Sequence, residues 1–187
     1  MTEKGRSMNN SLEQFISSRK ETILLTWKTL VLGTYPPETA SFIKRESDPF
    51  LNPVGRALVH TGELLLKIAV SGAERQEVEE GLGDIVRMRA VQGFSPSQAL
   101  CFMKEMKKAV WKGMLPAMLE GDFVKDWRVV ESRLDEAMLA AFDLYVACAK
   151  RIDEIRVNEA KAEKERLLRL IRAMNKGNDR FTAGGVD

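Results

Sequence analysis

Apolar side chains recur three and four residues apart along nearly the whole of this 187-residue chain. That spacing gathers them on one side of an α-helix, whereas a half-buried strand needs strict alternation of apolar and polar residues. We find no pair of alternating segments joined by a hairpin turn, and no internal sequence repeat. The sequence therefore predicts an all-α fold.

Proline and glycine divide this pattern into separate helices. Proline is favoured at the first position of a helix, and glycine directly after the last turn. Helices are expected over residues 10–33, 37–45, 53–71, from about 73 to the Arg87 region, from 96 with a kink or restart at Pro116, and from about 123 to 176. Gly177 and Asn178 supply the expected stop of the last helix.

Length and composition allow one domain with a real core and an appendage, since 44% of the residues are apolar and 30% are charged. We assign residues 10–152 to the domain and residues 153–176 to an extension of its last helix, with disorder expected in residues 1–9 and 177–187. A formal net charge of +2 argues against a nucleic-acid binder, which needs a clear basic excess.

The cellular compartment is suggested by the cysteines and by the apolar runs. Cys101 and Cys148 lie in helical patterns without metal-binding or disulfide spacing, which fits a reducing compartment. The first ten residues are polar, and the most apolar run, residues 23–33, is shorter than the roughly 20 residues that a spanning helix needs. We expect a cytoplasmic protein without membrane insertion.

The most informative turn lies within residues 87–112, RMRAVQGFSPSQALCFMKEMKKAVWK. Gly93 gives the backbone freedom to turn, Ser95 is a natural N-cap, and Gln98 follows the cap by three residues, as in a capping box. The stretch has no nucleophile beside a base and no metal-ligand spacing. We therefore expect no enzyme, no catalytic or metal-binding residues and no cofactor.

Arg89 continues the inward face formed by the apolar residues at positions 78, 82 and 85. A buried guanidinium needs a carboxylate or several carbonyl groups to offset its desolvation. The favoured interpretation is structural: Arg89 ties the helix end to a neighbouring turn, through Asp48 or a helix C-terminus. The alternative is a polar pocket, formed with Gln92, Ser95 and Gln98, that takes an anion or a partner residue beside a helix N-terminus.

The last helix carries an approximate heptad of apolar residues, which predicts pairing with a second helix. The candidate seam of a parallel homodimer consists of Leu134, Met138, Ala141, Tyr145, Cys148 and Ile152. Residues 153–166 are almost wholly charged and are expected to be a solvated connector. Lys104, Lys107, Lys108 and Lys112 form a basic stripe, for which a solvated face is the default and an acidic partner the alternative.

Several landmarks together resemble the N-terminal domain of the RsbR/RsbRD proteins, the co-antagonists of the switch kinase RsbT in bacterial stressosomes. They are Thr26-Trp27, Tyr35-Pro36, and residues 50–55, 87–99 and 102–104. The resemblance implies a globin-like, all-helical domain without haem, usually dimeric, that receives a signal and relays it along its C-terminal helix. Stressosome members continue into a STAS domain, for which the residues beyond the last expected helix are too few, so output is expected to come from a partner.

These observations predict a non-enzymatic signal-input or adaptor protein that acts by dimerisation and by protein–protein contact through its C-terminal helix. The alternative is a structural accessory subunit of a larger cytoplasmic or membrane-associated complex, without a sensing role. Haem is not expected, because His60 is the only histidine and none lies near Arg87, where an iron-bearing helix would be. A structural or partly exposed role is expected for His60.

Overall fold

The computed structural model describes residues 12–46, 48, 50–119 and 124–182, and side chains are described except in 116–119 and 173–182. The described residues contain helices and no strand, so the predicted all-α fold is confirmed. Helical residues 12–18 precede α2 (Lys20–Leu32), α3 (Pro37–Arg45), α4 (Pro53–Ser71), α5 (Arg75–Val91), α6 (Pro96–Ala99), α7 (Cys101–Leu119) and α8 (Val124–Thr182). The chain divides into two compact units, residues 1–148 and residues 149–187.

The connection from α3 to α4 is closed by a single side chain, Asn52. Its Oδ1 accepts a hydrogen bond from the Gly55 backbone N–H at 2.8 Å, which caps α4. The sequence predicts this cap, because Asn52 stands directly before Pro53 at the first helical position. Its Nδ2 donates to the backbone carbonyls of Ile43 at 2.9 Å and Glu46 at 2.8 Å. Because those carbonyls belong to the end of α3, one buried amide joins the end of one helix to the start of the next.

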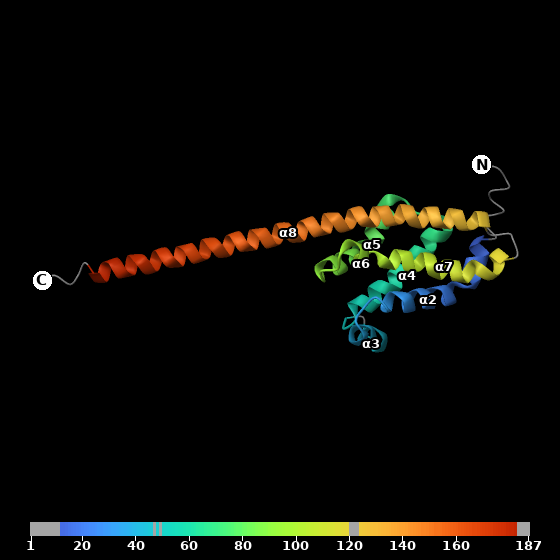
Figure 1. Cartoon of the computed structure of the whole chain (residues 1–187), viewed down its shortest axis with the longest axis horizontal. Helices are drawn as coiled ribbons and strands as arrows, with labels where there is room; N and C mark the ends of the chain where they lie inside the picture. The colour runs from blue at the N-terminus through green and yellow to red at the C-terminus, as the bar shows by residue number, and fades with distance from the viewer. Residues whose placement is uncertain (1–11, 47, 49, 120–123, 183–187) are drawn as a thin grey trace. The chain divides into compact units, whose positions relative to one another are not determined.

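The core of the first unit forms where α2 packs along α7 and α4 meets both (Figure 1). Trp27 is buried there, and its indole N–H donates to the Phe102 carbonyl at 2.9 Å. Gly62 of α4 permits this packing, because a Cβ at that position would lie 2.6 Å from Trp27 Cζ3. The apolar spacing of the sequence predicts an inward face for each of α4, α5 and α7 and for Ala99 of α6, and most of these residues are buried: Leu58, Thr61, Leu65, Ile68, Val78, Leu82, Ile85, Val86, Ala99, Phe102, Met103, Met106 and Val110. Val54, expected on the same face of α4, is partly exposed.

Arg133 and Tyr145 are among the polar side chains that join helix α8 to the rest of the first unit. Arg133 Nη1 donates to the carbonyls of Ala69 and Val70 in the last turn of α4, where a helix leaves carbonyl groups unpaired. The Tyr145 hydroxyl donates to the Phe94 carbonyl at 2.6 Å. These bonds fix which face of α8 turns toward the core.

Some predicted helix boundaries are wrong. The first expected helix is interrupted at Arg19, whose φ of −114° and ψ of 8° depart from helical values, and the helix expected from Pro96 is divided at Leu100 by a similar departure. α7 continues through Pro116 without a restart, and α8 continues past Gly177 to Thr182. In the sequence, Ser11 with Gln14 resembles a capping box at the start of the first helix. Ser11, residues 1–9, where disorder is expected, and residues 183–187 lie outside the described residues.

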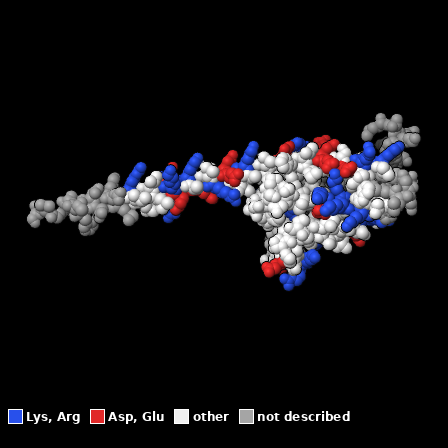
Figure 2. Space-filling model, in the orientation of Figure 1, with Lys and Arg blue, Asp and Glu red and all other residues white. Residues whose placement is uncertain are grey.

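In the second unit, every described side chain from 153 to 172 is exposed. Lysine and arginine are interspersed with aspartate and glutamate along this part of α8 (Figure 2). Exposed pairs three and four residues apart include Arg156 with Asp153 at 3.8 Å and Arg169 with Glu165 at 3.7 Å. Each such pair stabilises a helix by only a few tenths of a kcal/mol, so this segment depends little on specific contacts.

Candidate functional site

Arg89, on α5, is completely buried, as its place on the inward stripe predicts. Its Nε donates to the Tyr35 hydroxyl at 3.0 Å, and its Nη1 donates to the carbonyls of Gln98 at 3.1 Å and Ala99 at 3.2 Å. The guanidinium carbon also lies over three aromatic rings, 4.9 Å from the centroid of Tyr35, 5.4 Å from that of Phe94 and 5.5 Å from that of Phe102. The cation is therefore surrounded by aromatic faces, carbonyl oxygens and the Tyr35 hydroxyl.

No carboxylate of the described residues lies within ion-pairing distance of Arg89. Asp48, one of the partners considered from the sequence, instead accepts a hydrogen bond from the Phe50 backbone N–H at 2.8 Å. Within the same described set, Arg89 Nη2 is buried and has no hydrogen-bond acceptor. The guanidinium thus donates hydrogen bonds through Nε and Nη1, but no carboxylate of the described residues neutralises its charge. A buried charge without an ion-pair partner is unusual.

The turn that follows Arg89 brings its aromatic and carbonyl partners into place. Gly93 adopts a φ of +78°, a left-handed conformation that favours glycine. Ser95 and Gln98 form the predicted capping box at the start of α6: the Ser95 backbone N–H and its hydroxyl each donate to Gln98 Oε1 at 3.0 Å. The fixed turn sets Phe94 against the Tyr35 ring, with centroids 5.7 Å apart.

The four residues of the candidate polar pocket lie in different surroundings. Arg89 is buried, whereas Gln92, Ser95 and Gln98 are exposed. Arg89 reaches Gln98 through a backbone carbonyl, and Ser95 reaches the Gln98 side chain. Gln92 lines a separate groove between α4 and α5.

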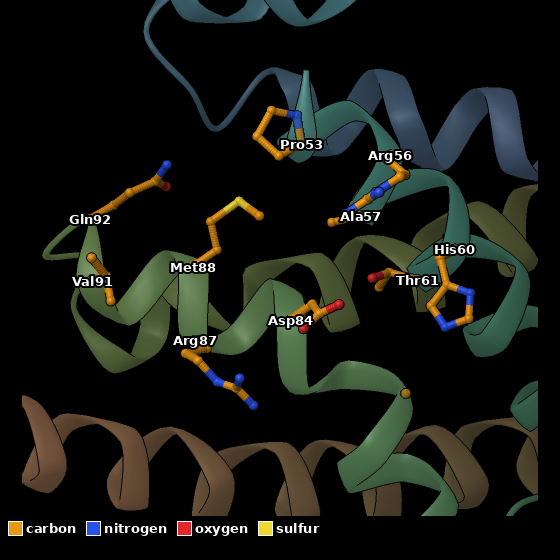
Figure 3. Close-up of a pocket in the computed structure, with 11 residues that line it drawn as sticks. Pro53, Arg56, Ala57, His60, Thr61, Asp84, Arg87, Met88, Val91 and Gln92 are labelled. Carbon is orange, nitrogen blue, oxygen red and sulfur yellow. The ribbon is translucent and has the colours of Figure 1, made fainter. Parts of the chain in front are cut away.

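That groove has a volume of about 780 Å³, and its walls come from both helices (Figure 3). Met88 of α5 extends toward Pro53 of α4, and Arg56 and His60 line the α4 side. His60 is exposed, in line with the partly exposed role expected from the sequence. The groove is therefore lined by a mixture of apolar, polar and charged residues, and Arg89 is not one of them.

The candidate dimer seam divides in two by burial. Leu134, Ala141 and Tyr145 are buried within the first unit, where they pack into the protein's own core. Met138, Cys148 and Ile152 are partly exposed. The half of the candidate seam formed by Leu134, Ala141 and Tyr145 is thus part of the inward face of α8, because a helix packed on its own domain needs nearly the same apolar spacing as a coiled coil.

A different face of α8 exposes apolar side chains. Leu139 and Phe142 are 67% and 45% exposed, and the partly exposed Val146 follows four residues later. We call these three residues the outer stripe. Their spacing of three and four residues places them on one side of the helix, away from the side that carries Leu134 and Ala141.

The basic stripe is partly used within the chain. Lys107 pairs with Asp135 at 2.9 Å and with Glu131 at 3.4 Å, both on α8, and Lys108 pairs with Glu105 at 2.7 Å. Lys104 and Lys112 are exposed.

In the first turn of α8, burial raises the pKa of the Asp126 carboxyl above its usual value.

A family model described as the RsbT co-antagonist protein rsbRD N-terminal domain matches residues 21–160, which is most of the chain. The chain belongs to this family. No curated protein and no solved structure was found to match it. The matched residues of this rsbRD N-terminal domain include Arg89 with its aromatic partners, the capped turn, the groove and the outer stripe.

The rsbRD N-terminal domain, over its described residues, has no group of three or more His, Cys, Asp or Glu side chains placed to hold a metal ion. Across the same residues, no helix is long and apolar enough to cross a membrane. Sequence reasoning identified Arg89 but missed Tyr35, Phe94 and Phe102, which surround it. Their aromatic character was visible in the sequence, but their convergence on one cation depends on three separate segments.

Proposed function

We propose that this rsbRD N-terminal domain is a signal-input module of the stressosome type, which acts by protein–protein contact and not by catalysis. The family match over residues 21–160 carries the proposal. The exposed outer stripe supports it, because apolar side chains at helical spacing on a surface are typical of an interface.

In this proposal, two copies of the chain pair in parallel through the outer stripe, Leu139, Phe142 and Val146. This stripe replaces the seam centred on Leu134, Ala141 and Tyr145, whose side chains are already committed to the domain's own core. Pairing removes the outer stripe from water, which stabilises the dimer by about 25 cal/mol for each Å² of apolar surface buried. It leaves the core of each copy undisturbed.

The partner contact is assigned to the charged part of α8. Side chains 153–172 are exposed, and isolated helical segments held mainly by short-range ion pairs are marginally stable in water. A partner that binds such a segment can therefore order or reorder it at low cost. The partner is expected to be a protein that supplies the output of the module.

Light scattering on the full-length protein tests the pairing. A Leu139→Glu/Phe142→Glu variant should be monomeric where the parent is dimeric. The chain offers a closely matched control, Leu25→Glu/Phe42→Glu, because Leu25 and Phe42 are 68% and 46% exposed, against 67% and 45% for the outer-stripe residues. The control variant should stay dimeric.

Two results would count against this proposal. A monomeric parent would remove pairing from the mechanism and favour the alternative of an accessory subunit. A Leu139→Glu/Phe142→Glu variant that dimerises as tightly as the control would show that the outer stripe is not the interface.

A further inference from the structure

Cys101 is the first residue of the 19-residue helix α7, and its sulfur accepts a hydrogen bond from the buried guanidinium of Arg89. Arg89 Nη1 lies 3.3 Å from Cys101 Sγ. The other terminal nitrogen, Nη2, is buried without an acceptor among the described residues. The sulfur thus adjoins a cation whose charge no carboxylate of that part of the chain neutralises within ion-pairing distance.

Two features make the position of this sulfur electropositive: the Arg89 guanidinium adjoins it, and Cys101 begins a helix. Cationic neighbours stabilise thiolates and their oxidised anions, and the N-terminus of a helix carries a partial positive charge. Cys101 is also partly exposed, so a small oxidant can reach it. We propose that Cys101 is a modification site at which hydroperoxides oxidise the thiol to sulfenic acid.

The oxidation is a two-electron step with hydroperoxide as the oxidant. The cysteine sulfur attacks one peroxide oxygen, and an S–O bond forms as the O–O bond breaks. Sulfur is oxidised and the peroxide is reduced. The second oxygen takes up the thiol proton and departs as water from hydrogen peroxide, or as an alcohol from an organic hydroperoxide. The new oxygen on sulfur is a hydrogen-bond acceptor beside Arg89, whose Nη2 lacks one.

Cys148 serves as an internal control for this site. It is partly exposed, as Cys101 is, and both are free thiols. Cys148 lies within α8 and not at its start, and in the described part of the chain its sulfur has no hydrogen bond and no cation contact. A difference in reactivity between the two cysteines therefore reports on Arg89 and on the start of α7. The modification does not depend on the proposed signalling function, because its readout is chemical.

The test exposes the full-length protein to hydrogen peroxide in the presence of dimedone, which traps sulfenic acid, and measures labelling of each cysteine by peptide mass spectrometry. Cys101 should be labelled about tenfold faster than Cys148, as expected for a thiol in an electropositive environment. Cys148→Ser should retain this labelling and Cys101→Ser should lose it. Equal labelling of the two cysteines, or faster labelling of Cys148, would overturn the proposal.

An Arg89→Met variant tests the role of the guanidinium, since methionine fills part of the space without a charge. Where circular dichroism shows that this variant is folded, the ratio of labelling rates should fall toward one, and an unchanged ratio would overturn the assignment to Arg89. Arg89→Lys keeps the charge and should retain most of the preference for Cys101. If neither variant folds, the ratio in the parent protein decides the proposal.

Discussion

Truncation of Arg89 tests the interpretation of the buried cation most directly. Arg89→Ala removes four hydrogen bonds, to the Tyr35 hydroxyl, to the carbonyls of Gln98 and Ala99 and to the Cys101 sulfur. It also empties the space among three aromatic rings. Hydrogen bonds from a charged donor stabilise a fold by about 1.5–3 kcal/mol each. The desolvation of a guanidinium without a carboxylate offsets several kcal/mol of that gain.

The net loss for Arg89→Ala is therefore expected to be about 3 kcal/mol, since the variant leaves buried acceptors unpaired and a cavity behind. Arg87→Ala is the matched control, because Arg87 lies two residues earlier on the same helix with an exposed side chain. Its effect should stay within about 0.5 kcal/mol of the parent. The measurement is urea-induced unfolding followed by far-ultraviolet circular dichroism.

A double-mutant cycle separates the hydrogen bond from the cavity. Tyr35→Phe removes the hydroxyl that accepts from Arg89 Nε and keeps the ring. The two substitutions should be non-additive, with a coupling of about 1 kcal/mol. An Arg89→Ala variant as stable as Arg87→Ala would refute the reasoning, because it would mean that the aromatic and carbonyl contacts contribute nothing beyond the cost of burying the charge.

Three further predictions concern other parts of the first unit. Ser95→Ala should lower the free energy of unfolding by about 1 kcal/mol, less than Arg89→Ala, because it removes half of the capping box; an unchanged urea midpoint would contradict this. Burial raises the pKa of the Asp126 carboxyl, so the ionised carboxylate destabilises the folded state above that raised pKa. This destabilisation disappears as the pH falls below the ordinary aspartate range. Asp126→Asn should therefore be more stable than the parent at neutral pH, with an advantage that shrinks in acid; a constant difference across pH would exclude titration of Asp126 as the cause. Added haem should give no stoichiometric Soret complex, and such a complex abolished by His60→Ala would contradict the expectation.

The sequence alone determined the features that depend on residues three or four positions apart. The spacing of apolar residues predicted an all-α chain and its inward stripes, including the burial of Arg89. Asn52 and Ser95 were recognisable as caps, because a cap and the backbone group that it satisfies lie within one turn.

Only the tertiary structure decided what each buried face meets. Tyr35, Phe94 and Phe102 converge on Arg89 from three segments, and no local pattern specifies that meeting. The α8 heptad predicted burial of Leu134, Ala141 and Tyr145, but periodicity cannot say whether a stripe is buried by a second copy or by its own domain. The physical reason is the same in each case: spacing along a helix fixes which side chains share a face, whereas the partner of that face is chosen by packing between elements that are distant in the sequence.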